Sequence, residues 1–215
     1  MIPGSCEFLI ENENRLRQVP ELQKLRRQHF SASNFAFPNA AATFLSDPAA
    51  RGVQLEISAR LKFPEFRTGR FGLRVLANAS CAESSAAEYT EVGFERAANH
   101  SRVYVDRRRS SGGVRDADIR SGPWVPTGSV TNLHVFVDRS IVTLIADNVT
   151  SISLWVHPTD VAASQRVALF SGPSIQGVHA EQIDVWQLAD PESGMGAVFD
   201  SQWSREDGVK KRLLH

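Results

Sequence analysis

The chain has 215 residues, of which 42% are hydrophobic and 22% charged, and this composition is ordinary for a globular protein of one large or two small domains. Its 24 basic residues balance 24 acidic ones, so the net charge indicates neither a nucleic-acid nor a membrane partner. No apolar run approaches the roughly 18 residues that cross a bilayer. The first residues, which include Pro3, Gly4 and Glu7, do not have the pattern of a signal peptide.

The first segment, residues 1–30, is predicted to be a connector that contains a short helix. Pro20 suits the start of a helix because its missing N–H is not needed there. Leu22 and Leu25 are spaced so that they share one helical face. A helix this short is not stable alone, so we expect it to pack against the rest of the chain.

The second segment, residues 31–189, has the pattern of a β-domain. Residues 31–48 are expected to be irregular or to form an edge. The run 53–63, VQLEISARLKF, alternates apolar and polar residues, which predicts a strand with one face in a core and Glu56 on the other face. Further strands are predicted at residues 71–76, 88–96, 102–106, 166–171 and 177–188.

The central stretch of this domain is residues 133–158. It contains three runs rich in Val, Ile, Thr, Phe and Trp, which favour a half-buried pleated surface. Asp147 and Asn148 separate the second run from the third, and these residue types tolerate positive φ in a tight turn. We therefore expect an antiparallel β-meander here.

These patterns predict an all-β fold, a two-sheet antiparallel β-sandwich of the concanavalin or lectin type with a short N-terminal helical connector. Residues 190–215 lose the alternation and are predicted to be a C-terminal tail. The expected division is therefore 1–30 connector, 31–189 sandwich and 190–215 tail.

No catalytic motif is found, and the six histidines lack the spacing of metal ligands. The sequence therefore predicts no catalytic residue, no metal site and no cofactor. Cys6 and Cys81 lie far apart, and the spacing leaves open whether they pair or remain free buried thiols.

Aromatic and basic residues give the candidate binding positions. Trp155 and Trp186 are expected in the core, whereas Trp124, in a loop between Gly122-Pro123 and Pro126, is the candidate exposed ring for stacking on a sugar. The run 107–109, Arg-Arg-Arg, suits an anion site or a solvated turn. Asp106, just before it, has the pattern of a turn anchor or local salt bridge, as does Asp138.

Three Asn-x-Ser/Thr sequences, at Asn78, Asn99 and Asn148, are candidate N-glycosylation sites. Such acceptors hint at secretion, but the chain shows no signal peptide, and the localisation stays unassigned.

Four motifs together resemble a known family. The run LHVFVDRSIV, closing with HP at 157–158, is similar to the C-terminal β-sandwich signature of the fructan-hydrolysing glycoside hydrolases, the invertases, inulinases and levanases. The other three motifs, in the same order as in that family, are RL, PEL and LR between residues 15 and 26, VYVDR with RSSG between 103 and 112, and VWQL at 185–188.

The resemblance implies a partner domain that carries the chemistry. Family members, many of them secreted, hold their nucleophile, stabilising aspartate and acid/base glutamate on an N-terminal five-bladed propeller, and glycoside hydrolysis needs two opposed carboxylates. The propeller motifs do not occur in this sequence, which is expected to start where the propeller would end. We therefore expect a non-enzymatic module with a structural role, its partners being a separate propeller or a second copy in a homo-oligomer. The alternatives are a lectin-like carbohydrate-binding module, suggested by Trp124 and the glycosylation motifs, and a relic without activity.

Overall fold

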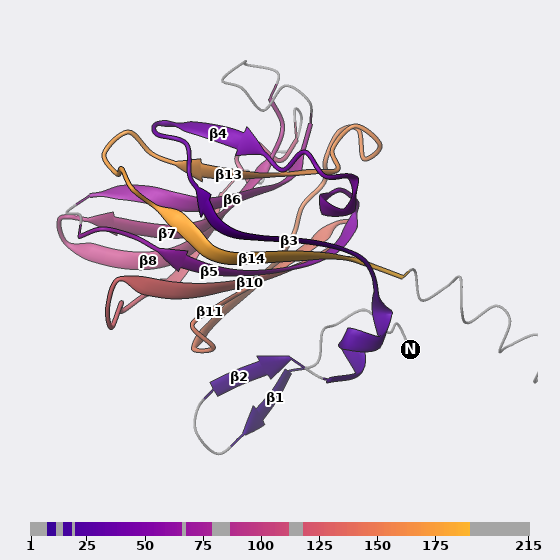
Figure 1. Ribbon diagram of the computed structural model, residues 1–215, viewed down its shortest axis with the longest axis horizontal. Coiled ribbons are helices and arrows are strands. Elements are labelled where there is room, and N and C mark those ends of the chain that lie inside the picture. The colour runs from indigo at the N-terminus through magenta and orange to yellow at the C-terminus, as the bar shows by residue number, and fades with distance from the viewer. Residues whose placement is uncertain are drawn as a thin grey trace, which may run out of the picture.

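The computed structural model describes residues 8–11, 15–18, 20–65, 68–78, 87–111 and 118–189. Two antiparallel six-stranded sheets pack face to face, and a separate two-stranded hairpin precedes them (Figure 1). No helix within these ranges has the length and hydropathy that a membrane crossing requires. The prediction of an all-β sandwich is confirmed.

Sheet 1 contains the predicted meander. In order across the sheet, its strands are β12 (Thr150–Trp155), β11 (Ile141–Ala146), β10 (Val130–Asp138), β5 (Gln54–Lys62), β14 (His179–Leu188) and β3 (Arg26–Ala36). The strands β10, β11 and β12 are consecutive in sequence and adjacent in space, as a meander requires.

Sheet 2 covers the other side of the core. Its strands in order are β4 (Ala41–Phe44), β13 (Arg166–Ser171), β6 (Gly69–Ala77), β7 (Thr90–Ala97), β8 (His100–Asp106) and β9 (Ile119–Pro123). β3 and β4 are edge strands of their sheets, so the expectation of irregular or edge structure at 31–48 is confirmed for the edges. A 3-10 turn, η2 (Pro48–Ala50), follows β4.

The predicted helical connector is wrong as an α-helix. The hairpin strands β1 (Phe8–Glu11) and β2 (Arg15–Gln18) are followed by a six-residue 3-10 helix, η1 (Pro20–Leu25), that leads directly into β3. A segment this short between two strands cannot propagate an α-helix, and 3-10 turns commonly serve as such connections.

The limits of the predicted domains are only partly described. β3 begins at Arg26, so the sandwich takes in the last residues of the segment 1–30 that we expected to be connector. Residues 190–215 and both cysteines, Cys6 and Cys81, lie outside the described ranges. The division into connector, sandwich and tail otherwise stays a prediction.

The core between the sheets follows from the alternation of the strands. Leu55, Ile57 and Leu61 of β5 point inward and are at most 1% exposed, facing Phe71 and Leu73 of β6. Burying each such side chain stabilises the fold by roughly 1.5–3 kcal/mol. The inward set predicted for 53–63 is therefore confirmed.

The turn of the meander is fixed by its own polar residues. Asp147 and Asn148 have φ of 50° and 57°, the pair of positive values that a type I′ hairpin turn needs. The Asp147 carboxylate accepts hydrogen bonds from Thr131 Oγ1 at 2.8 Å and from the backbone N–H of Asn132 at 2.7 Å. These bonds hold the β11–β12 turn against the start of β10.

A pair of glycines lets β6 and β7 approach closely. Gly72 and Gly93 are directly opposite each other in the register. A Cβ on Gly72 would lie 2.2 Å from the carbonyl oxygen of Val92, and one on Gly93 would lie 2.2 Å from that of Phe71. The two strands therefore have no room for side chains at this pair.

Replacing Gly93 by alanine should destabilise the sandwich by about 1–3 kcal/mol, because the added Cβ collides with backbone that cannot move freely. The free energy of unfolding from urea titrations measures the effect. Gly128→Ala is the matched control, since a Cβ there meets nothing within 4 Å. Equal unfolding free energies for Gly93→Ala and Gly128→Ala would contradict this reading of the glycine pair.

Candidate functional site

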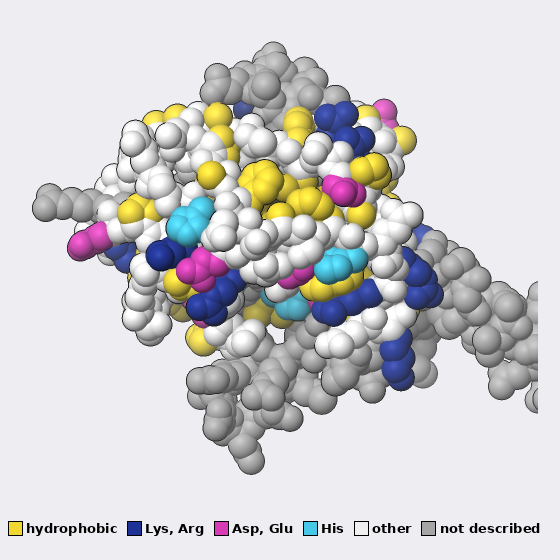
Figure 2. Space-filling view, viewed as in Figure 1, with side chains coloured by type: hydrophobic (Ala, Val, Ile, Leu, Met, Phe, Trp, Pro, Cys, Tyr) yellow, Lys and Arg dark blue, Asp and Glu magenta, His cyan; other side chains and the backbone are white. Residues whose placement is uncertain are grey.

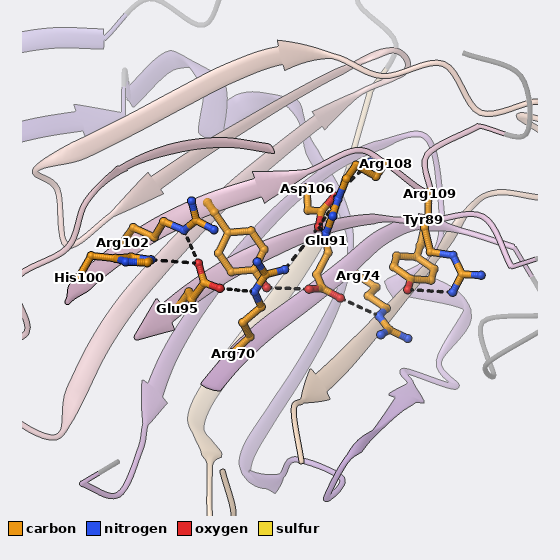
Figure 3. Close-up of polar contacts among 11 residues, drawn as sticks. Arg70, Arg74, Tyr89, Glu91, Glu95, His100, Arg102, Asp106, Arg108 and Arg109 are labelled. Carbon is orange, nitrogen blue, oxygen red and sulfur yellow. Dashed lines mark hydrogen bonds and ion pairs between the residues drawn. The ribbon is translucent and has the colours of Figure 1, made fainter. Parts of the chain in front are cut away.

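The outward face of sheet 2 carries a dense set of charged and tyrosine side chains (Figure 3). Alternate residues of β6, β7 and β8 point away from the core, because their neighbours Phe71, Leu73, Phe94 and Val105 point into it. The outward set, named the polar cluster below, comprises Arg70, Arg74, Tyr89, Glu91, Glu95, His100, Arg102, Tyr104, Asp106, Arg108 and Arg109.

The strand register arranges part of this cluster in rows across the sheet. A middle row contains the two glycines, flanked by an aromatic ring on each side. From β13 to β8 the rows are Arg74–Glu91–Asp106, Phe170–Gly72–Gly93–Tyr104 and Arg70–Glu95–Arg102. The middle row, which has no side chains at its two glycines, lies between two rows of charged side chains.

Glu91 is held from two sides. Its carboxylate accepts hydrogen bonds from Tyr104 Oη at 2.7 Å and from Arg74 Nε at 3.2 Å, and the residue is 8% exposed. Burial, together with the nearby negative charge of Glu91, raises the pKa of Tyr104. Tyr104 therefore stays a neutral phenol, and its hydroxyl donates a hydrogen bond to the carboxylate.

Asp106 anchors the turn that follows β8. It accepts hydrogen bonds from the backbone N–H of Arg108 at 3.1 Å and from its guanidinium at 2.6 Å, and Arg70 Nη1 lies 3.5 Å away. Burial alone would raise the pKa of Asp106, but the hydrogen bonds and charge of Arg108 outweigh it and lower the pKa. The prediction of a turn anchor and local salt bridge is confirmed for Asp106.

Arg70 lies at the centre of the polar cluster. Its Nε donates to Glu95 at 2.6 Å, and its guanidinium lies over the Tyr104 ring, 4.8 Å from the centroid. Arg102 also donates to Glu95, and His100 Nε2 lies 3.6 Å from it. Burial tends to raise the pKa of Glu95, but Arg70 and Arg102 lower it overall.

Two adjoining pockets open on this face, and Arg70 and Glu91 line both of them. The first has a volume of about 390 Å³ and lies toward β13 and β4, where Arg74, Phe170, Ser171 and several small residues also line it. The second has a volume of about 400 Å³ and is completed by Tyr89, Asp106, Arg108 and Arg109. Volumes of this size hold small ligands.

The chemistry that this face offers is hydrogen bonding and charge. Glu91, Glu95 and Asp106 are each ion-paired with arginine, and the arginines lower the pKa of Glu95 and Asp106, which is the opposite of what a general acid needs. Within the part of the chain that the structure describes, no group of three or more His, Cys, Asp or Glu side chains is placed to hold a metal ion. The cluster is suited to binding rather than to proton transfer.

The predicted exposure of Trp124 is wrong. The residue is 4% exposed, and its ring packs between Phe94 and Phe63 with centroids 4.7 and 5.4 Å away. Its backbone N–H donates to the Ser101 carbonyl at 3.3 Å, which continues the β8–β9 ladder by one residue and places Trp124 at the end of the sheet rather than in a free loop. The exposed ring on which the sugar-stacking prediction depended is therefore absent.

The predicted burial of Trp155 is also wrong, because the residue is 58% exposed. β12 is the edge strand of sheet 1, and every second residue of it points to solvent. The Trp155 ring stacks on His157 with centroids 6.3 Å apart. Trp186, the other tryptophan expected in the core, is half-buried on the outward face.

The three glycosylation candidates lie at strand ends. Asn78 is partly buried just after β6, whereas Asn99 and Asn148 are exposed in the hairpin turns after β7 and β11. Glycosylation at these positions stays a prediction. Of the three consecutive arginines, Arg107 is bound by Asp118 at 2.6 Å and by the Trp155 carbonyl at 3.0 Å, and the other two line the second pocket.

A second polar site, on the outward face of sheet 1, was missed by the sequence reasoning. Glu56 is completely buried there and accepts hydrogen bonds from Arg26 Nε at 2.7 Å and Nη2 at 2.5 Å, and His134 Nε2 lies 2.9 Å from it. The Arg26 guanidinium also lies 3.8 Å from the Trp186 ring, which stacks on His29. Figure 2 shows a band of basic, acidic and histidine side chains over β3, β14 and β5.

Burial alone would raise the pKa of Glu56, but Arg26 and His134 lower it to about 2. The alternation of β5 placed Glu56 on a polar face and gave no sign of its burial. The only available signal was that Arg26 and Trp186 both fall in segments that resemble family motifs.

The comparison with known families now decides the classification. The profile described as Glycosyl hydrolases family 32 C terminal matches residues 21–187, which is most of the chain.

The chain belongs to this family.

Solved structures agree with the family 32 C-terminal fold. Fructan 1-exohydrolase IIa from Cichorium intybus is similar with a TM-score of 0.66 at 16% identity, covering 82% of this chain and 38% of that one. The β-fructofuranosidase from Aspergillus kawachii has a TM-score of 0.64 at 21% identity, covering 80% of this chain and 29% of that one. The exo-inulinase from Aspergillus awamori has a TM-score of 0.60 at 19% identity, covering 82% of this chain and 33% of that one. No curated protein sequence matches the chain. At these identities the likeness shows the fold, and the chain spans little more than a third of the first of these relatives.

The motifs of the family 32 C-terminal sandwich have structural roles here. Asp106 and Arg107 begin the turn after β8, and Ser110 completes it by donating from its N–H and Oγ to the Arg107 carbonyl at 3.0 and 2.7 Å. Arg139 has φ of 53° in the β10–β11 hairpin, and its N–H donates to the Val53 carbonyl at 2.6 Å. These residues shape turns.

Acid should weaken this family 32 sandwich in a window set by Glu56. Because its folded pKa of about 2 lies below the ordinary 4.5, its stabilisation is complete above pH 4.5 and is lost as the pH falls toward 2. The loss is at most about 3 kcal/mol, and urea titrations at several pH values measure it.

The Glu56→Gln variant should be less stable at pH 7, because the half-buried Arg26 loses its counter-charge, and should lose less stability between pH 4.5 and 2. Glu181→Gln is the control, since its carboxylate forms a more exposed pair with Arg60. If the free energy of unfolding of Glu56→Gln falls between pH 4.5 and 2 as steeply as that of the unchanged protein, the loss of stability in acid belongs to other carboxylates.

Proposed function

We propose that this chain is a non-catalytic β-sandwich module of a β-fructofuranosidase-like protein, and that its role is structural. The observation that carries the proposal is the match of residues 21–187 to a C-terminal family, while the chain covers only 29–38% of the similar fructan-hydrolysing structures. On this proposal, catalysis belongs to a separate propeller domain, and the sandwich covers or supports it.

The geometry of the carboxylates supports a role without catalysis. Glycoside hydrolases place two carboxyl groups across the scissile bond, and one of them has a raised pKa so that it can act as an acid. In the polar cluster, by contrast, arginines lower the pKa of Glu95 and Asp106. The space between the sheets is filled by the apolar core, so within the described residues no cleft passes through the sandwich.

The junction between connector and sandwich supports a structural role. Arg26 is the first residue of β3, and its guanidinium donates to the buried Glu56 of β5, on the other side of β14 in sheet 1. The N–H of Ala189, just after β14, donates to the carbonyl of Leu25 at 2.8 Å. A domain attached through η1 would therefore be held by a rigid junction.

Self-association is the second candidate for the structural role. Val125 and Val149 are 80% and 67% exposed, and they flank the hydrogen bond from Thr150 Oγ1 to the Pro123 carbonyl at 2.8 Å. Two exposed apolar side chains therefore lie close to each other at one edge of the sandwich, beside the edge strand β12. The carbohydrate-binding alternative through Trp124 loses its support, since that ring is buried.

The purified chain should release no fructose from sucrose, inulin or levan above the rate of a blank. A reducing-sugar assay with an active β-fructofuranosidase as positive control measures this, and any turnover that follows the protein through purification contradicts the proposal. Light scattering over a range of concentrations then separates the two structural roles. A monomer favours support of a separate propeller, and a concentration-dependent dimer favours self-association.

A further inference from the structure

We propose that the polar cluster on sheet 2 binds a hydroxylated anion, a sugar that carries a carboxylate or a phosphate group. The proposal rests on the two adjoining pockets and their charge, and it is independent of the structural role proposed above.

The charge of the site favours an anion. The polar cluster holds five arginines and three carboxylates, so its fixed charges leave an excess of two positive charges. Arg108 and Arg109 lie at the exposed rim of the second pocket, and Arg70 lies between the two pockets. An anionic group entering the second pocket would meet these three guanidinium groups, which bind carboxylate and phosphate oxygens well.

The carboxylates of the site favour hydroxyl groups on the same ligand. Glu91 is held in place by Tyr104 on one carboxylate oxygen and by Arg74 on the other, so its remaining lone pairs point in fixed directions. A site for a simple anion needs hydrogen-bond donors alone, whereas here the Glu91 carboxylate lines both pockets beside the arginines. A ligand with hydroxyl groups satisfies both, since a hydroxyl donates to carboxylate and accepts from guanidinium.

The spare donor capacity of Arg70 supports the same ligand class. A guanidinium has five N–H donors, and Arg70 directs its Nε to Glu95 and its Nη1 toward Asp106. Its Nη2 group is not used in these bonds. Because Arg70 lines both pockets, it is placed to contact a ligand that extends from one pocket into the other.

The walls of the site match the size and surface of a sugar. Phe170 borders the first pocket and Tyr89 borders the second, so each pocket combines one aromatic ring with charged groups. The Arg74 guanidinium lies 4.1 Å from the centroid of the Tyr89 ring and 5.3 Å from that of the Phe170 ring. Arg74 therefore packs against both rings and forms the wall between the two pockets. Small-molecule sites typically have this mixture of aromatic wall and few fixed polar groups.

Titration calorimetry tests the proposal with four probes, which are glucuronate, glucose 6-phosphate, glucose and inorganic phosphate. We expect at least one anionic sugar to bind with a Kd of about 1 mM or tighter and to bind at least about tenfold more tightly than glucose and inorganic phosphate. The first two probes distinguish a carboxylate from a phosphate. Raising the ionic strength from about 0.05 M to about 0.5 M should weaken the binding, because part of it is electrostatic.

Arg109→Gln and Arg108→Gln locate the site. Each should weaken binding of the anionic sugar by about tenfold or more. Arg120→Gln is the matched control, because Arg120 is an exposed arginine of the same sheet that pairs with Asp118 and lines neither pocket. Thermal unfolding confirms that each variant is folded, and Arg109→Gln carries the test by itself if Arg108→Gln disturbs the turn at Asp106.

Three results would overturn the proposal. They are no binding of either anionic sugar at about 10 mM, an affinity for inorganic phosphate that equals or exceeds that for both anionic sugars, and equal affinity of the Arg109→Gln and Arg120→Gln proteins. The second result would show an anion site without recognition of hydroxyl groups.

Discussion

Each strand of a sandwich has two faces, and only one of them can enter the core that the two sheets share. In this chain the inward residues of β5 and β6 are apolar and almost fully buried, so these strands leave no room for a charged group between the sheets. The charged groups described above are therefore on the outward faces. This constraint places the polar cluster on sheet 2 and the Glu56 site on sheet 1, with the whole thickness of the core between them.

Both outward faces contain carboxylates that are removed from water, and both neutralise them with arginine. On sheet 1, Arg26 and His134 surround Glu56, and on sheet 2, Arg74 and Arg108 hold Glu91 and Asp106. An unpaired buried carboxylate would cost several kcal/mol, so these pairs contribute to the stability of both sheets. The two sites differ in access. The Glu56 carboxylate is fully enclosed, whereas the sheet 2 carboxylates border open pockets.

The fold could be predicted from the sequence because alternation is a local signal. The strand at 53–63, the meander and its Asp147–Asn148 turn each follow from a few neighbouring residues. Burial of single aromatic rings depends instead on which strand becomes an edge and on where a loop folds. Trp155 and Trp124 were assigned to the wrong environments for this reason. The prediction of a helical connector was wrong for a related reason. The residues there favour a helix, but the short segment between two strands has room only for a 3-10 turn.

The polar cluster could be predicted only in fragments. The sequence indicated that Asp106 anchors a turn and that the arginines after it suit an anion. It could not show that Arg70, Glu91 and Tyr104 come together, because register across β6, β7 and β8 is a property of the folded sheet. Cross-strand neighbours at this spacing leave no periodic trace in a single sequence.

The first and last strands of the sandwich run side by side, since β3 pairs with β14 and Ala189 hydrogen-bonds to Leu25. The chain thus enters and leaves the fold at nearly one point. A unit built in this way can be spliced behind another domain, or into one of its surface loops, without pulling that host apart. The same closeness makes the sandwich suited to circular permutation, with a short bridge across residues 25 and 189 and new ends in an exposed hairpin.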